Sequence, residues 1–144
     1  MSFWPWTLAM ERYDLAMVQP LPIRREQPPD DAVVVVRAGV MDRQSLERAA
    51  RQCFDGYGVL AISVEAVIGT TVDQACRTSP RLSQYRQVRL SSIGRLIQGP
   101  FVLLPTFEPP HLSVILPDLS DLTVPRLIRC FDDPIPNPGL DPSR

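Results

Sequence analysis

The hydrophobic and polar positions of the chain follow two periods, one typical of helices and one of strands. Residues 31–39 form a short run of β-branched apolar residues closed by Gly39, which predicts a buried strand. Residues 41–58 instead repeat their apolar positions at helical spacing, with Asp42 placed to cap the N-terminus and Gly56 or Gly58 to end the helix. The inward face of this helix is expected to consist of Leu46, Ala49, Ala50, Cys53 and Phe54.

The rest of the chain continues the alternation of strands and helices. Strands are predicted at 59–69, 87–91, 101–104 and 111–116, and helices at 70–80, 91–100 and 121–131. The order βαβαβαββα predicts one α+β domain in which about four helices pack on a mixed sheet. Thr71 and Thr123 are expected to cap the N-termini of their helices. The inward residues of the 91–100 helix are expected to be Ile93, Leu96 and Ile97, and Ile128 and Phe131 are further core residues.

Proline divides the chain into three regions, because nine of its 16 prolines lie before residue 32 or after residue 133. Proline removes backbone donors and disfavours helix, so both flanks are expected to be extended. The predicted regions are an N-terminal arm with Trp4 and Trp6 (1–31), the α+β domain (32–131) and an acidic, proline-rich tail (132–144). Each flank is expected either to fold back on the domain or to dock on another chain.

Composition excludes several classes of protein. The formal net charge of -1 gives no overall field toward nucleic acid or membrane, and no apolar run approaches the length of a membrane helix. No signal peptide is recognisable, so a cytoplasmic protein is expected. The three cysteines, Cys53, Cys76 and Cys130, are widely spaced, which argues against a disulfide framework, a zinc site or a redox motif. No metal or cofactor is expected.

Two residues are candidates for acid–base chemistry. His111 is the only histidine, and it follows Glu108 and two prolines at the start of a predicted strand, so a loop or strand-edge imidazole competes with a general acid or base. Glu65 lies within an apolar strand, where an unpaired carboxylate is costly. Glu65 is therefore expected to face solvent, to pair with Arg37 or to lie in a pocket.

Charge is segregated in one segment. Between residues 77 and 95 the chain carries no acidic residue, but it carries Arg77, Arg81, Arg86, Arg89 and Arg95. Tyr85 lies among them, and arginines interleaved with an aromatic residue are typical of surfaces that bind phosphates and unstacked bases. The alternative is a solvated face balanced by acidic residues elsewhere, such as Asp118 and Asp132.

Two classes of function fit these features. In the first, the protein is a small bacterial effector, comparable in size to the toxins of two-component modules, with a cognate antitoxin-like partner. It would bind RNA or another phosphate-bearing substrate through the 77–95 arginines and act on it without metal, using His111, Tyr85 or Glu65 for proton transfer. In the second, it is a non-enzymatic adaptor whose arm and tail grip a protein partner, with the arginines facing an acidic surface. The one-signed charge of the segment favours the first class.

Overall fold

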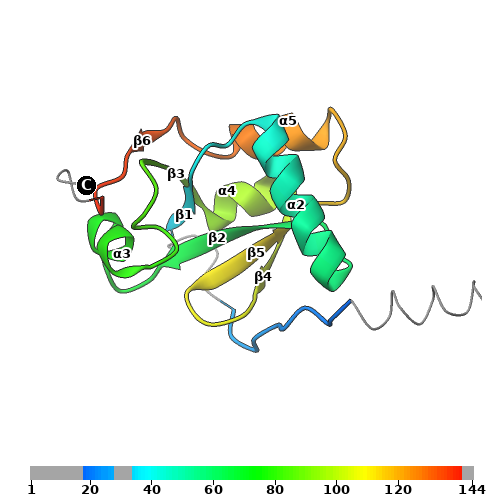
Figure 1. Ribbon diagram of the computed structural model, residues 1–144, viewed down its shortest axis with the longest axis horizontal. Helices are drawn as coiled ribbons and strands as arrows, with labels where there is room; N and C mark the ends of the chain where they lie inside the picture. The colour runs from blue at the N-terminus through cyan, green and yellow to red at the C-terminus, as the bar shows by residue number, and fades with distance from the viewer. Residues whose placement is uncertain (1–17, 28–33, 141–144) are drawn as a thin grey trace, which may run out of the picture.

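Six strands form one antiparallel sheet in the order β4-β5-β2-β1-β3-β6 (Figure 1). The computed structural model describes residues 18–27 and 34–140, so Trp4, Trp6 and most of the predicted arm lie outside the described residues. The strands are β1 (Val34–Ala38), β2 (Ala61–Val67), β3 (Gln87–Ser92), β4 (Val102–Pro105), β5 (His111–Ile115) and β6 (Ile135–Pro136). The helices are α2 (Arg43–Tyr57), α3 (Val72–Thr78), α4 (Ile93–Gln98) and α5 (Thr123–Arg129).

The α+β class and the predicted order of elements are confirmed, with β6 added at the end. The mixed sheet is wrong, because every pairing is antiparallel. The long helix α2 carries the chain away from the end of β1, and β2 then returns beside β1 in the opposite direction (Figure 1). A helix between two strands therefore does not by itself produce a parallel pair.

The main core lies on one face of the sheet. Alternate residues of β2 and β5, including Ile62, Val64 and Val114, point to this face and are almost fully buried. They pack in one cluster with Leu96 of α4 and Leu127 of α5. The intervening residues of the same two strands point to the opposite face, where the cluster of buried apolar residues is smaller. That second face carries the candidate site.

Local signals place the ends of two helices as predicted. The Asp42 side chain accepts a hydrogen bond from the Ser45 amide at 2.7 Å, and Gly58 ends α2 with a left-handed φ of 72°. Thr71 likewise caps α3 by accepting from the Gln74 amide at 3.1 Å. Thr123 does not cap α5, because its hydroxyl is buried and donates to Asp118 instead.

Two apolar residues that were expected inside are exposed. Phe54 of α2 is 51% exposed and Ile97 of α4 is 43% exposed. The buried contacts of α2 come from Leu46 and Ala50, so the apolar stripe is buried in its first part only. Helical spacing identifies one face of a helix, but it does not show how far along that face the core extends.

The region after residue 131 joins the fold. Strand β6 pairs with β3, and Asn137 is buried directly after it. Figure 1 shows this segment beside α3, where Gly139 approaches the backbone of Cys76 so closely that an added Cβ would lie 2.3 Å from it. Within the described part of the chain, no helix is long and apolar enough to cross a bilayer.

A pair of phenylalanine variants tests the extent of the core. Phe131 is 4% exposed, so Phe131→Ala is expected to lower the free energy of unfolding by about 3 to 5 kcal/mol. Phe54→Ala removes the same atoms from an exposed position and is expected to cost less than about 1 kcal/mol. Denaturant melts of both variants provide the measurement, and equal losses would contradict the arrangement described above.

Candidate functional site

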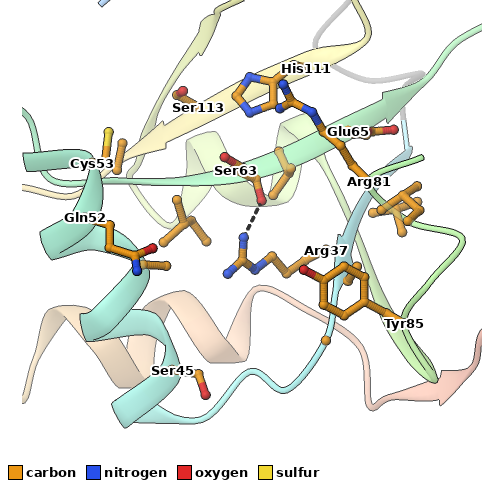
Figure 2. Close-up of a pocket in the computed structure, with 18 of the residues that line it drawn as sticks. Arg37, Ser45, Gln52, Cys53, Ser63, Glu65, Arg81, Tyr85, His111 and Ser113 are labelled. Atoms are coloured by element: carbon orange, nitrogen blue, oxygen red, sulfur yellow. Dashed lines mark hydrogen bonds between the residues drawn. The ribbon is translucent and has the colours of Figure 1, made fainter. Parts of the chain in front are cut away.

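A pocket of about 800 Å³ opens where β1 separates from β2. The two strands pair only as far as Val36 and Glu65, and β2 continues alone on that side from Val64 back to Ala61. The floor of the pocket comes from β2 and β5, one wall from α2, and the other from the segment 81–85 (Figure 2). The pocket therefore lies over a gap in the sheet rather than at its edge.

The floor is polar because two strands alternate in register. Glu65 of β2 pairs with His111 of β5, and Ser63 pairs with Ser113, so all four side chains lie on the same face. Glu65, His111 and Ser113 are buried, whereas Ser63 is exposed within the pocket. The interpretation of Glu65 as solvent-facing is wrong, and the alternative that it lies in a pocket is confirmed. His111 is the first residue of β5, as predicted, but it is buried in a strand interior to the sheet rather than exposed at a loop or edge.

Arg37 bridges the gap between β1 and β2. Its Nη1 donates to the Ser63 carbonyl at 2.8 Å, and its Nε is buried with no partner among the described residues. Burial lowers the pKa of Arg37 below its ordinary value. The expected Arg37–Glu65 pair is not formed, because the guanidinium turns into the pocket toward Ser63 (Figure 2). An arginine with a free buried donor is suited to an anion.

Contacts with Thr106 favour one tautomer of the His111 ring. Its Nδ1 lies 3.2 Å from the Thr106 carbonyl and 2.9 Å from the Thr106 hydroxyl, which in turn lies 2.7 Å from Ser113 Oγ. A carbonyl oxygen only accepts, so this contact favours the tautomer with the proton on Nδ1. Nε2 is then an acceptor, and it is buried with no partner in the described structure.

The surroundings of His111 keep it neutral. Burial, followed by the positive charge of Arg81 and a smaller effect of Arg24, lowers its pKa from 6.5 to about 4, although the Thr106 contact acts in the opposite direction. The Phe107 ring packs edge-on against the imidazole, with centroids 5.2 Å apart. A histidine in this setting serves as a neutral polar group at pH 7 rather than as a cation.

The structure brings together four residues that the sequence analysis singled out for chemistry. His111, Glu65, Tyr85 and Arg81 all line the pocket. Their side chains do not form a catalytic chain: Figure 2 shows the Glu65 carboxylate pointing away from His111, and its Oε1 accepts from Ser79 Oγ at 2.8 Å. Tyr85 lies beside Arg37 (Figure 2).

The other predicted anion-binding arginines lie elsewhere. Arg89 donates from Nε to the Asp132 carbonyl at 2.7 Å, and Arg95 forms an ion pair with the Asp132 carboxylate at 2.8 Å. Arg77 belongs to α3 and Arg86 precedes β3, and neither lines the pocket. The 77–95 arginines are therefore distributed over different parts of the fold, and only Arg81 among them reaches the pocket.

The C-terminal segment holds the wall that carries Arg81 and Tyr85. Asn137 Nδ2 donates to the carbonyls of Leu82 and Tyr85 at 2.7 and 2.8 Å. The Asn137 amide donates to the Arg86 carbonyl at 3.0 Å, and its Oδ1 accepts from the Gly139 amide at 2.8 Å. The only asparagine of the chain thus clamps one side of the pocket.

Sequence reasoning missed part of the site. Arg48 and Gln52 of α2 line the pocket on the helix face next to its buried residues, and Phe107 closes the end near His111. One signal was present in the sequence: Ser63 and Glu65 in one strand, and His111 and Ser113 in another, are spaced two apart. Two apolar strands that each carry a polar pair at this period predict a shared polar face, but their register cannot be read from the sequence.

No protein-family model, curated protein or solved structure matches the chain. Among residues 18–27 and 34–140, no group of three or more histidine, cysteine or acidic side chains is arranged to hold a metal ion. Cys53 is the one cysteine that lines this pocket, and burial raises the pKa of its thiol, which disfavours the reactive thiolate. What the pocket offers is a set of arginines, an aromatic ring and a neutral imidazole.

Stability should depend on pH through His111. Below pH 6.5 the His111 side chain binds a proton in the unfolded chain, whereas in the folded chain it stays neutral until about pH 4. The free energy of unfolding therefore falls as pH decreases through this window. The full loss is about 3 kcal/mol. His111→Phe cannot bind this proton, so the difference between its denaturant melts and those of the wild type isolates the effect. A variant whose stability changes with pH as the wild type does would exclude this account.

Proposed function

We propose that the pocket binds a phosphate-bearing small molecule, of which a nucleotide is the best match. The observation that carries the proposal is the convergence of Arg37, Arg48 and Arg81 on one pocket, with no ion pair to any of them in the described structure. Arginines without acidic partners present donors in the fork geometry that suits phosphate oxygens. The Arg37 Nε, buried and unpartnered, is a donor for which a bound anion would provide the acceptor.

The size and lining of the pocket support a nucleotide over a bare phosphate. A volume of about 800 Å³ lies within the usual range for small-molecule sites. Tyr85 is 42% exposed at the pocket wall, beside Arg37, where its ring is available for a base to stack on. The phosphate would bind the arginines while the base covers the tyrosine.

Binding is a better match to this site than acid–base catalysis. A general base works best with a pKa near the working pH, whereas burial and Arg81 lower the pKa of His111 to about 4. The Glu65 carboxylate is engaged by Ser79 and does not orient the imidazole. A nucleotide at the end of an RNA strand presents the same groups as a free one, so RNA binding by a bacterial effector is one form that this proposal takes.

Two arginine variants test the proposal. Arg81→Ala removes a pocket donor and is expected to weaken binding of AMP about ten- to hundredfold, the usual effect of losing a charge-assisted hydrogen bond. Arg86→Ala is the matched control, since this arginine is exposed, five residues away and outside the pocket. Calorimetric titration of the full chain with AMP, ribose 5-phosphate and inorganic phosphate gives the affinities, and thermal melts confirm that both variants fold.

Two results would contradict phosphate binding at this pocket. If none of the three probes binds saturably, or if Arg86→Ala weakens AMP binding as much as Arg81→Ala does, the pocket is not a phosphate site. Binding that is weakened in Arg81→Ala and unchanged in Arg86→Ala would indicate that the phosphate binds at the pocket rather than along the whole 77–95 segment.

A further inference from the structure

The imidazole of His111 is a deeply buried polar group of the pocket that keeps one nitrogen without a hydrogen-bond partner. The residue is only 2% exposed, its Nδ1 is engaged by Thr106, and its Nε2 has no partner within the described residues. Buried acceptors are nearly always hydrogen-bonded in native proteins, because the desolvated lone pair is otherwise uncompensated. An orphaned acceptor at a pocket wall indicates a partner supplied from outside the chain.

The side chain of Arg81 lies beside the imidazole. Figure 2 shows Arg81 extending across the pocket toward the His111 ring, and its charge is close enough to disfavour protonation of the imidazole. No hydrogen bond joins the guanidinium to Nε2 in the described structure. Arg81 therefore lies against the imidazole without providing Nε2 with a partner.

Arg81 is free to leave this position. Its side chain is exposed and makes no hydrogen bond or ion pair in the described structure, so turning it away breaks no direct interaction. By contrast, the ring of His111 is held by Thr106 on one edge and Phe107 on its side. A phosphate that draws Arg81 away would uncover a fixed acceptor.

We propose that His111 Nε2 accepts a hydrogen bond from a sugar hydroxyl of the bound ligand, and that it becomes available when Arg81 turns to the ligand's phosphate. This inference rests on the proposed function and narrows it to phosphate esters that carry a free hydroxyl. Ser63 and Ser113 lie on the same floor beside His111, which makes this part of the pocket suited to a sugar. Arg81 then binds the phosphate of the ligand, and its movement gives the sugar hydroxyl access to His111 Nε2.

The charged groups around the ring define what a titration of His111 should show. Arg81 faces it from the segment after α3 and Arg24 from the N-terminal segment, while the carboxylate of Glu65 on the adjacent strand β2 points away from it. Arg24 is fixed, because its Nη1 donates to three carbonyls, two of them those of Thr106 and His111. Arg81 is therefore the one of the two arginines whose movement changes the environment of the ring.

Selective ¹⁵N labelling of histidine tests the inference directly, since the full chain contains a single histidine. The free protein is expected to show Nδ1 protonated and Nε2 unprotonated at pH 7, and AMP should shift the Nε2 resonance in the direction of hydrogen-bond acceptance. In Arg81→Ala the imidazole should titrate at a higher pH than in the wild type, with Arg86→Ala as the unchanged control. A free protein with the proton on Nε2, or an unchanged titration in Arg81→Ala, overturns the inference.

Ligand analogues provide a second test of the inference. AMP is expected to bind about tenfold more tightly than 2′,3′-dideoxyadenosine monophosphate, which lacks both sugar hydroxyls, and His111→Phe should abolish this difference. Equal affinities in the wild type, an Nε2 resonance unmoved by bound AMP, or AMP no tighter than phosphate would each refute the role of His111 while leaving phosphate binding intact. Absence of binding by every probe would instead refute the proposed function, so the two failures are distinguishable.

Discussion

The antiparallel register between β2 and β5 is the constraint on which the rest of the structure depends. It places Ile62, Val64 and Val114 on the face that packs against α4 and α5, and it places Glu65 and His111 on the other. A shift of one residue in either strand would exchange the two faces of that strand, burying its polar side chains in the core. The strong preference for burying the apolar set therefore also fixes which polar groups meet beneath the pocket.

The pocket contains buried polar groups without hydrogen-bond partners, which would be too costly in the apolar core. Arg37 Nε and His111 Nε2 are both withdrawn from water without partners in the described residues, and each such group costs on the order of 1 to 3 kcal/mol. A domain with a total stability of roughly 5 to 15 kcal/mol retains this cost only where the surrounding structure enforces it. Here the enforcement comes from Ser63, Thr106 and the packing of Phe107.

Local signals in the sequence were enough to predict the elements other than β6, but not their assembly. Asp42, Thr71 and Gly58 act within one turn of their own position, so caps and helix ends follow from neighbouring residues. The burial of Glu65 depends instead on strands that are distant in sequence, and the exposure of Phe54 depends on where the core ends. The arginine segment was misleading for the same reason: charge density along the chain says nothing about how α3, β3 and α4 distribute its members in space.

The position of Asn137 after every other strand also affects when the pocket wall forms during synthesis. Strand β6 and Asn137 follow every other strand of the sheet, yet they hold the carbonyls of Leu82 and Tyr85 that shape one wall of the pocket. During synthesis on a ribosome, the sheet from β1 to β5 can pair before these residues emerge, because chains are made from the N-terminus. The wall that carries Arg81 and Tyr85 acquires its clamp only afterwards, so the nascent chain can contain a nearly complete sheet while its pocket is still unfinished.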